Sequence, residues 1–289
     1  MAEKSATTAQ AVSDRFTFSP RRARPSNTVS PGYTRDPVPI RAVVFDLFDT
    51  LVDLRWERLP VTEHRGKKLP ASTPALHERV RSCCGVDLDA FLDTMMQGDR
   101  EFAETHYRHD REVPTELRMG DVLRRLGIED AALARELTLL HMSVLRSGVE
   151  VVSHHGAVLD GLRRSLRLGL CSNFSHSETA LAVLEQAGLR DRLDARALVV
   201  SDAFGLRKPR AEIFAEVVAR LGVAAGETLH VGDSLRADVG GAANAGLRTA
   251  WITRRVSDAA AALADHEGPR PDHVIGDLAE LPDLVATIG

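Results

Sequence analysis

Residues 42–51 read AVVFDLFDTL, an apolar run that leads into an aspartate and then into a polar turn. A short apolar run bounded by turn-forming residues is typical of a buried β-strand. We therefore predict a strand over residues 41–46 that ends at Asp46. A carboxylate at the end of a buried strand is placed to do chemistry, and more distant stretches of the chain indicate which chemistry.

The rest of the chain alternates between strand and helix patterns, with one long interruption. Short apolar strands that alternate with helices predict an α/β fold, with a Rossmann-like parallel sheet core covered by helices on both faces. Residues 72–148 interrupt this alternation with largely helical patterns, such as Val122, Leu123 and Leu126 on one face, and we predict a small inserted α-helical domain there. The predicted strands are 166–171, 197–201, 228–231 and 248–252, the predicted helices are 178–187, 211–221 and 236–245, and a short strand and helix follow residue 273.

The composition is that of an ordinary globular protein. The chain has 289 residues, of which 44% are hydrophobic and 27% charged, and its net charge is −4. Because this charge is slightly negative and aromatic residues make up only 4%, we expect no nucleic-acid partner. No apolar stretch approaches the roughly 18–20 residues needed to span a bilayer. The three cysteines lack a metal-binding CxxC spacing, so we expect a cytoplasmic protein without a membrane partner.

The first 39 residues differ from the rest of the chain. They are rich in Ser, Thr, Pro and Arg and show no hydrophobic period, which predicts a disordered tail. A transit peptide is the alternative, because arginines cluster at positions 21, 22 and 24. The acidic residues Glu3, Asp14 and Asp36 count against it.

Polar clusters follow four of the predicted strands, at the point where each strand ends. In a parallel sheet, ligands bind beyond the carboxyl ends of the strands. Each cluster taken alone would be assigned to a turn or a helix cap. Four clusters in this order, each after a predicted strand, instead predict one shared site. They are Asp46, Ser172–Asn173 in LCSNFSH, Lys208 in DAFGLRKPRAEIF, and Asp233 with Asp238 in GDSLRAD.

The four clusters resemble the four motifs of the haloacid dehalogenase superfamily, which lie between residues 42 and 238, and the resemblance covers almost all of the chain except the N-terminal tail. The helical insert falls where capped members of subfamily I type carry their cap domain. The resemblance implies a hydrolase with a small anionic substrate that the cap selects, and we expect a monomer or homodimer. The implied division is a disordered tail over 1–39, a Rossmann-like core over 40–58 and 150–289, and a helical cap over 59–149.

By the same resemblance, Asp46 is the nucleophile and Lys208 neutralises charge on the nucleophile and the substrate. Thr50 and Ser172 help to hold the transferred group, and Asn173 contributes to substrate binding. These roles agree with the chemistry of the residues. An aspartate can attack phosphorus or a halogen-bearing carbon, and phosphoryl transfer requires positive charge around the equatorial oxygens together with oriented donors.

The resemblance also implies a Mg²⁺ cofactor, held by Asp46, Asp233 and the backbone carbonyl of Phe48, with Asp238 in an outer position. Charge supports this expectation, because two unit charges about 4 Å apart cost about 4 kcal/mol at an effective dielectric near 20. Three converging carboxylates and an anionic substrate therefore need a divalent cation in addition to a lysine. Magnesium suits a site of carboxylates, water and phosphate oxygens.

Phe48 departs from the phosphatase pattern of the superfamily. Phosphatases of the superfamily usually have an aspartate two residues after the nucleophile, which protonates the leaving oxygen and later activates water, whereas phenylalanine transfers no proton. Asp49 does not replace it, because neighbouring side chains of an extended segment point to opposite faces. We expect Asp49 to be a loop residue where relatives often have glycine. An aromatic residue at position 48 is similar instead to the 2-haloacid dehalogenases, in which halide leaves without a proton, and there Phe48 would contact the substrate.

Three hypotheses follow for function. The first is a Mg²⁺-dependent phosphatase for small phosphorylated metabolites, with an aspartyl-enzyme intermediate at Asp46, because Asp233 and Asp238 are both retained. The second is a 2-haloacid dehalogenase-type hydrolase, which Phe48 favours, although dehalogenases similar to this chain typically replace the acidic fourth motif with Ser and Asn. The third is a catalytically impaired ligand-binding or regulatory protein, because the usual acid is absent.

Several other residues are of types that often bind metals or substrates, but no sequence motif assigns them a role. His154 and His155 are adjacent, and adjacent side chains rarely converge on one metal ion, so the sequence favours a linker or surface role for this pair. A solvated helix face is favoured over substrate contact for the polar residues of the predicted cap. The candidates for substrate contact are His106, Arg108 and His109 in that cap, and Arg55, Arg58 and Arg65 after the first motif.

Overall fold

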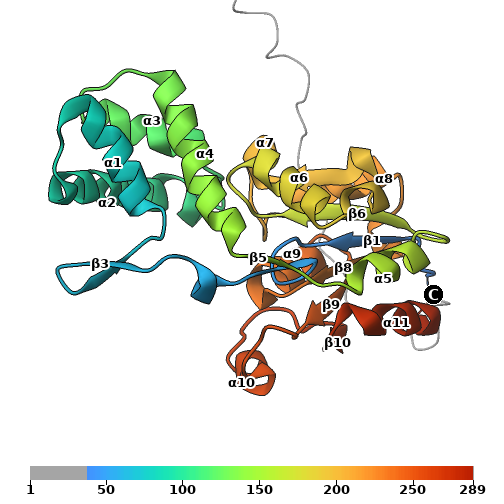
Figure 1. Ribbon diagram of the computed structural model, residues 1–289. Coiled ribbons are helices and arrows are strands. Elements are labelled where there is room, and N and C mark those ends of the chain that lie inside the picture. Colours follow the sequence, from blue (N-terminus) through green and yellow to red (C-terminus); the bar gives the residue numbers. More distant parts are fainter. Residues whose placement is uncertain (1–37, 289) are drawn as a thin grey trace, which may run out of the picture. The chain divides into compact units, whose positions relative to one another are not determined.

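The computed structural model describes residues 38–288, and its centre is a sheet of six strands (Figure 1). The strands lie in the order β10-β9-β8-β1-β6-β7, and every adjacent pair is parallel. The predicted α/β class with a Rossmann-like parallel sheet is thereby confirmed. The tail predicted over residues 1–39 lies, apart from residues 38 and 39, outside the described residues. The strands are β1 Ala42–Phe45, β6 Arg167–Ser172, β7 Leu198–Val200, β8 Thr228–Gly232, β9 Arg248–Ile252 and β10 His273–Ile275.

All four side chains of β1 are apolar and buried. Successive side chains of a strand point to opposite faces of the sheet. Val43 and Phe45 pack into one hydrophobic core, whereas Ala42 and Val44 pack into a second core. A strand that is buried on both faces cannot alternate between polar and apolar residues, which explains the continuous apolar run in the sequence.

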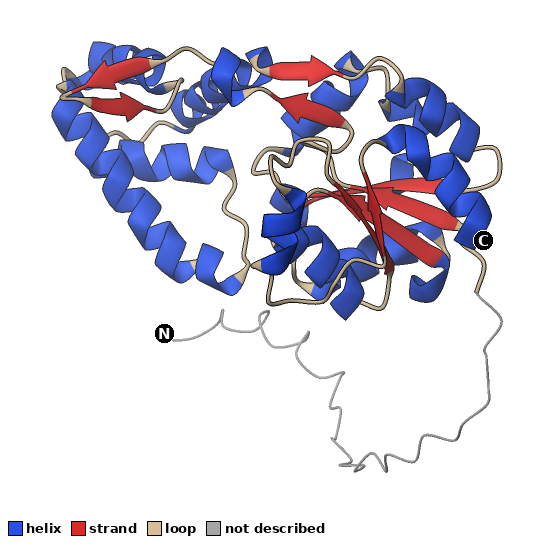
Figure 2. Cartoon of the chain, turned by 90° about the horizontal axis from the view of Figure 1, so that it is seen from below, coloured by secondary structure: helices blue, strands red, loops and turns tan. Residues whose placement is uncertain are grey.

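Helices cover both faces of the sheet (Figure 2). The core around Phe45 includes residues of α5, α6 and α11, and the core around Val44 includes residues of α8 and α9. The predicted bounds of α8 and β9 agree with the structure, whereas the predicted helix 236–245 is divided into a π-helix, η6, and the short α9. The helices outside the insert are α5 His155–Leu162, α6 Ser177–Gln186, α7 Ser201–Phe204, α8 Ala211–Leu221, η6 Leu235–Gly240, α9 Gly241–Asn244, α10 Ala259–Ala264 and α11 Leu281–Ile288. Short 3₁₀ turns are η1 Trp56–Arg58, η2 Tyr107–His109, η3 Arg190–Arg192, η4 Ala195–Ala197, η5 Ala225–Glu227 and η7 Leu278–Glu280.

The predicted helical insert contains four α-helices with a hydrophobic core of their own. Each helix contributes a fully buried side chain to it: Leu76, Phe91, Leu123 and Leu137. A separate core supports the proposal of a cap, whose boundaries at residues 59 and 149 remain a prediction. The elements are α1 Thr73–Cys84, α2 Leu88–Thr105, α3 Thr115–Arg125 and α4 Ala131–Ser147, preceded by an unpredicted hairpin of β3 Thr62–His64 and β4 Lys67–Leu69.

A small antiparallel sheet, also unpredicted, forms where the chain leaves the core and returns to it. We call this sheet the flap; it pairs β2 (Val52–Leu54) with β5 (Val149–Val151). Asp53 in β2 is buried, and Arg254, which follows β9, donates to both of its carboxylate oxygens. The flap is therefore attached to the core beside the carboxyl end of the central sheet.

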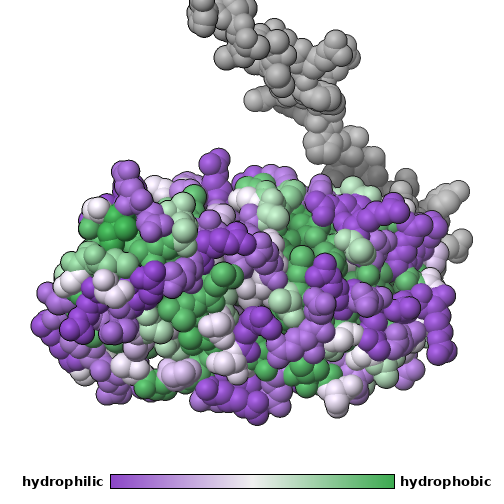
Figure 3. Space-filling model, turned by 45° about the horizontal axis from the view of Figure 1, so that its top comes forward, coloured by the Kyte–Doolittle hydropathy of each residue, from purple (hydrophilic) through white to green (hydrophobic). Residues whose placement is uncertain are grey.

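On the face drawn in Figure 3, hydrophobic side chains form patches that hydrophilic side chains interrupt. Among residues 38–288, no helix has both the length and the apolar character needed to cross a bilayer.

Leu170 tests the contribution of the central core to stability. Its side chain is fully buried in β6, so Leu170→Ala should lower the free energy of unfolding by about 2–5 kcal/mol. Leu139→Ala on α4 is the matched control: Leu139 is 47% exposed, and its truncation should cost about 0.5 kcal/mol or less. Urea unfolding measures both changes. Equal losses for the two variants would contradict the described packing.

Candidate active site

The predicted site residues lie at the carboxyl ends of adjacent strands. β1 pairs with β8, with Phe45 opposite Val231, and the Asp46 N–H donates to the Val231 carbonyl at 2.9 Å. Asp46 and Asp233 therefore follow the ends of two paired strands. The chain adds β6 and β7 on one side of β1 and then crosses to add β8 on the other side. Ligands bind parallel sheets at such a reversal of strand order.

Lys208 joins two of the predicted carboxylates. Its Nζ lies 2.6 Å from Asp46 Oδ1 and 2.6 Å from Asp238 Oδ1, and all three side chains are buried. Burial opposes the charge of Lys208, but Asp238 and Asp46 outweigh it and raise the pKa of the ammonium above its ordinary value. Burial also raises the pKa of Asp46, which Lys208 offsets only in part. Lys208 is therefore a fixed cation at neutral pH.

Asp233 completes a group of three carboxylates. One oxygen atom from each of Asp46, Asp233 and Asp238 lies within 4.8 Å of the other two. The main-chain carbonyl of Asp233 accepts a hydrogen bond from Trp251 Nε1 at 2.7 Å, which fixes the turn after β8. Burial, together with repulsion from Asp46 and Asp238, raises the pKa of Asp233 to about 7. Without a divalent metal ion beside it, the Asp233 carboxyl takes up a proton near neutral pH.

The turn after β8 brings Asp238 against the backbone of Gly232. A Cβ atom on Gly232 would lie 2.2 Å from Asp238 Cγ, so this approach requires glycine. Asp238 Oδ2 accepts from the Ser234 N–H at 3.0 Å, and Asp238 Oδ1 lies 2.9 Å from His230 Nε2. Burial alone would raise the pKa of Asp238, but Lys208 and His230 hold it well below its ordinary range. His230 was not predicted, because one histidine in an apolar strand indicates only a core residue.

Asn173 holds the loop that carries Lys208. Its side-chain carbonyl accepts from the Lys208 N–H at 2.7 Å, and its amide donates to the Lys208 carbonyl at 2.9 Å. The side chain thus positions Lys208, and its predicted contact with substrate stays a prediction. Ser172, buried at the end of β6, likewise stays a candidate for holding the transferred group.

The turn after β1 contains three residues in different environments. Phe48 packs on Phe174, with ring centroids 4.9 Å apart. Asp49 has a φ of +55°, in the left-handed region that glycine favours, and accepts from the Leu54 N–H at 3.2 Å, in agreement with the expected loop role. Thr50 is fully buried, and its Oγ1 has no hydrogen-bond partner among the described residues. An unpaired buried hydroxyl is costly, which makes Thr50 a suitable donor to a ligand.

The helical insert contacts the core beside the Lys208 loop, through a carboxylate that sequence patterns did not indicate. Glu112 is buried; it accepts from Ser201 Oγ at 2.5 Å and from Arg207 Nη1 at 3.2 Å. The Arg207 N–H donates to the Asp110 carbonyl at 2.8 Å. These partners lie 89 and 95 residues from Glu112 along the chain, so no local pattern predicts them.

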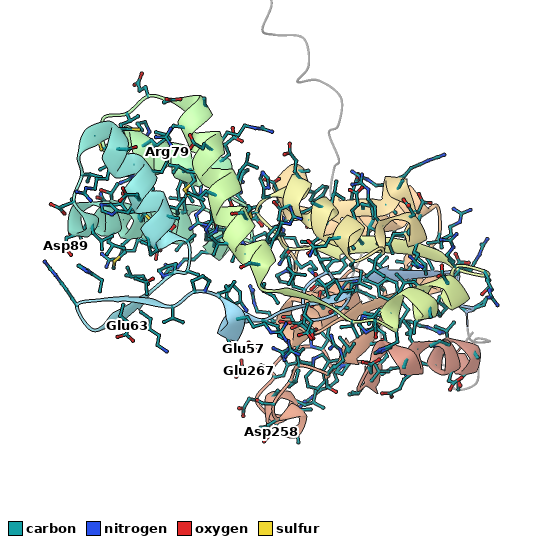
Figure 4. All side chains as sticks on the ribbon, viewed as in Figure 1. Glu57, Glu63, Arg79, Asp89, Asp258 and Glu267 are labelled. Carbon is teal, nitrogen blue, oxygen red and sulfur yellow. The ribbon has the colours of Figure 1, made fainter. Side chains whose placement is uncertain are left out.

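The other candidates for substrate contact form ion pairs or lie in the insert. Arg55 and Arg58 contact Glu150 of the flap, at 2.5 Å and 3.3 Å. Arg65 pairs with Asp89, which Figure 4 labels at the start of α2. His106, Arg108 and His109 lie in or next to η2.

The group of three carboxylates fits a hard divalent cation. Its donors are all oxygen atoms, which Mg²⁺ prefers. One lysine ammonium balances only part of three negative charges, and the raised pKa of Asp233 reflects its burial and then the remaining repulsion. Asp238 already accepts hydrogen bonds on both oxygens, so Asp46 and Asp233 are the carboxylates suited to direct binding of the ion.

Comparisons with known proteins place this geometry in context. The family model described as a haloacid dehalogenase-like hydrolase matches residues 40–246. N-acylneuraminate-9-phosphatase of Rattus norvegicus is 28% identical over 250 residues, which cover 86% of this chain and 95% of that protein. The 5-amino-6-(5-phospho-D-ribitylamino)uracil phosphatase YigB of Escherichia coli is 27% identical over 215 residues, which cover 74% of this chain and 83% of that protein.

Solved structures share the fold. The 2-haloacid dehalogenase from Pseudomonas syringae aligns with a TM-score of 0.60 and 21% identity, over 86% of this chain and all of that one. L-2-haloacid dehalogenase from Xanthobacter autotrophicus aligns with a TM-score of 0.54 and 20% identity, over 86% of this chain and 100% of that one. At this identity the likeness concerns the fold and not the reaction.

Replacing Asp233 by Asn should change how stability depends on pH when divalent cations are removed. The raised pKa means that Asp233 holds its proton more tightly in the folded chain than in the unfolded chain. Protonation of Asp233 stabilises the folded chain fully at pH values below the pKa of this carboxyl in the unfolded chain, which is about 4. This stabilisation is lost as the pH rises through about 7. In chelator, the thermal midpoint of the wild-type protein should therefore fall relative to that of Asp233→Asn as pH rises from about 5 to about 8.

Asp93→Asn serves as the control, because Asp93 is an exposed acid on α2. This variant should keep the pH dependence of the wild-type protein. Parallel curves for the wild-type and Asp233→Asn proteins would refute the raised pKa.

Proposed function

The chain belongs to the haloacid dehalogenase-like hydrolases, and on that basis we propose that it is a Mg²⁺-dependent phosphatase with an aspartyl-enzyme intermediate at Asp46. Its substrates in this proposal are small phosphorylated metabolites. The two relatives described above are named as phosphatases and match most of the chain, which supports phosphate transfer over halide release.

The observation that carries the proposal is the group of three carboxylates around one lysine. Oxygen atoms of Asp46, Asp233 and Asp238 lie within 4.8 Å of one another, and Lys208 bonds two of these residues. Like charges at such separations repel by several kcal/mol at an effective dielectric of about 20. A phosphorylated substrate adds further negative charge. A divalent cation held by Asp46, Asp233 and the Phe48 carbonyl would offset this repulsion, with Asp238 bonded to Lys208 behind them.

The residues of this chain supply the nucleophile and the positive charge for both steps of a phosphatase reaction, but at position 48 they supply no group for proton transfer. A carboxylate oxygen of Asp46 forms a bond to phosphorus while the bond to the leaving oxygen breaks. Water then attacks the phosphorus of the aspartyl-phosphate, which releases phosphate and restores the carboxylate. Lys208 remains protonated in both steps and offsets the charge on Asp46 and on the phosphoryl oxygens. Thr50 and Ser172 donate hydroxyl hydrogen bonds to the same oxygens. Bound Mg²⁺ supplies additional positive charge beside the transferred group.

Phe48 restricts the substrates that react quickly. It cannot protonate the leaving oxygen, and a general acid is typically worth about 10²–10⁴-fold in rate. Esters whose leaving group is stable as an anion need no such proton. We therefore expect slow turnover of simple alkyl phosphates and faster turnover of phosphates with good leaving groups.

A 2-haloacid dehalogenase reaction is the alternative that Phe48 favours. The Phe48–Phe174 pair provides apolar surface in the turn after Asp46, and halide would leave from a carbon attacked by Asp46 without proton transfer. Retention of Asp233 and Asp238 counts against this alternative, because a metal-independent reaction gains nothing from two more carboxylates beside the nucleophile. A ligand-binding role without catalysis is the third alternative.

The proposal also covers the organisation of the chain. The core over residues 40–58 and 150–289 carries the chemistry, and the cap over 59–149 selects the substrate. Cys83, Cys84 and Cys171 are all unpaired, which fits the reducing cytoplasm. Whether the chain acts as a monomer or homodimer remains a prediction.

A paired release assay tests the proposal. Phosphate release from a panel of small phosphate esters and chloride release from short 2-chloroacids are measured with Mg²⁺ and with excess chelator. We expect phosphate release that requires Mg²⁺ and that disappears in Asp46→Asn. Chloride release undiminished by chelator would replace the phosphatase proposal with the dehalogenase. If Asp46→Asn retained the cellular function, the non-enzymatic role would take its place.

Phe48→Asp should raise phosphatase activity, because it supplies the absent acid. We expect about a tenfold or greater increase in kcat on alkyl phosphates and a smaller increase on aryl phosphates, whose leaving groups depend less on protonation. Phe48→Asn is the matched control, since its amide is similar in size to a carboxyl but is no general acid. A similar gain in both variants would show that removal of the aromatic ring, rather than proton transfer, caused the change.

A further inference from the structure

A second group of potential metal ligands lies away from Asp46, at the start of α5. It consists of His154, His155 and Asp277, and we call it the His–His–Asp cluster. One ligand atom from each residue lies within 4.8 Å of the other two. Asp277 immediately precedes η7, and Figure 1 shows α5 beside α11, the helix that follows η7. The cluster therefore connects two parts of the chain: the segment that follows the flap and the carboxyl-terminal part.

His155 presents an unpaired nitrogen to this cluster. Its side chain is fully buried, and its Nδ1 lies 2.9 Å from the Leu51 carbonyl. Because a carbonyl only accepts, Nδ1 must carry the proton, and in the neutral ring Nε2 then presents a lone pair. His155 Nε2 has no hydrogen-bond partner among the described residues, and it lies 4.0 Å from Asp277 Oδ2. That separation is too long for a hydrogen bond.

This arrangement is the one that metal-binding histidines adopt. A histidine that binds a metal usually donates its other ring N–H to a carbonyl or carboxylate, which fixes the tautomer and the ring orientation. Two ligand atoms of a tetrahedral Zn²⁺ ion, with bonds of about 2.0–2.1 Å, lie roughly 3.4 Å apart, so His155 Nε2 and Asp277 Oδ2 at 4.0 Å need only a small approach to share an ion. An ion between these two atoms would satisfy both of them.

His154 supplies the third ligand and the route of entry. Its Nε2 donates to Asp277 Oδ1 at 2.6 Å, and an ion bound to Nε2 would replace this hydrogen bond with release of the proton. The His154 ring stands nearly perpendicular to that of His155, at 83°. The His154 side chain is 46% exposed, so an ion can reach the cluster from solvent and keep water as a further ligand. The sequence favoured a linker or surface role for this pair; in the structure His155 is fully buried, and one nitrogen of each ring lies within 4.8 Å of an Asp277 oxygen.

We propose that the His–His–Asp cluster binds a divalent first-row transition metal, of which Zn²⁺ is the representative. Two imidazole nitrogens and one carboxylate suit Zn²⁺ and its neighbours, whereas Mg²⁺ prefers an all-oxygen site. This site is separate from the carboxylate group around Lys208, and it does not depend on the proposed phosphatase reaction.

The local charge permits a cation in the cluster. Arg254 Nε lies 3.4 Å from Asp277 Oδ2, but the same guanidinium bonds both carboxylate oxygens of Asp53. Arg254 is therefore shared between the two carboxylates, and Arg55 Nη2 also lies 3.9 Å from Asp53 Oδ2, so Asp277 keeps part of its negative charge. A bound ion would thus connect α5 and η7 next to the attachment of the flap, and through His155 it would brace the Leu51 carbonyl in the turn that carries Thr50.

Zinc binding to the full-length protein tests the proposal. Calorimetric titration with Zn²⁺ is performed in excess Mg²⁺, which occupies the oxygen-rich carboxylate group. We expect one equivalent of Zn²⁺ to bind and to raise the thermal midpoint. His154→Ala and Asp277→Asn should each weaken this binding by at least about tenfold, the scale of loss when a metal site is perturbed. Asn can still cap η7 at position 277, so the second variant preserves the turn.

Two comparisons separate this site from others. His109→Ala removes an exposed histidine outside the cluster and should leave zinc affinity unchanged. Asp233→Asn should also leave it unchanged. Zinc binding that is lost in Asp233→Asn and kept in His154→Ala would assign the metal to the carboxylate group and overturn the proposal, and so would the absence of zinc binding to the wild-type protein.

Discussion

The structure depends on one buried ammonium group. Lys208 Nζ bonds Asp46 and Asp238 at 2.6 Å each, and without it two carboxylates would lie in the interior without a counter-charge. Buried charges are tolerated only when they are paired and hydrogen-bonded, so the surrounding loops are organised to keep these groups in place. Asn173 holds the Lys208 backbone from one side, and the segment around Glu112 holds the adjacent Arg207. In the proposed reaction, the same charge would make Asp46 compatible with an anionic substrate.

The parallel sheet explains why these residues meet. Strand order reverses between β1 and β8, so the turns that follow these two strands are neighbours although they lie far apart in the chain. The absence of a Cβ at Gly232 lets Asp238 approach the strand end, and Trp251 secures the turn from β9. The scaffold of a haloacid dehalogenase-like hydrolase is thus intact around Asp46. The departure is at Phe48, where an aromatic pair with Phe174 replaces a proton-transferring side chain.

The flap connects the site to the rest of the molecule. Asp53 in the flap pairs with Arg254, and Arg254 also approaches Asp277 of the His–His–Asp cluster. His155 contacts the carbonyl of Leu51, in the same turn as Thr50. Residues outside the carboxylate group around Lys208 can therefore influence how the Asp46 turn is held.

Several features followed directly from local patterns in the chain. Burial on both faces gives a strand an unbroken apolar run, as in β1 and in the strand over 248–252, and burial of one helical face gives a periodic pattern, as in the helix over 211–221. The order of the motif residues predicted their shared edge, since parallel strands end on the same side. Other features depend on folding, because their partners are remote in sequence: His230 behind Asp238, Glu112 against Ser201, and Asp277, which lies 123 residues from His154. No local period encodes such contacts; only the packing of the sheet and its helices brings those side chains within bonding distance.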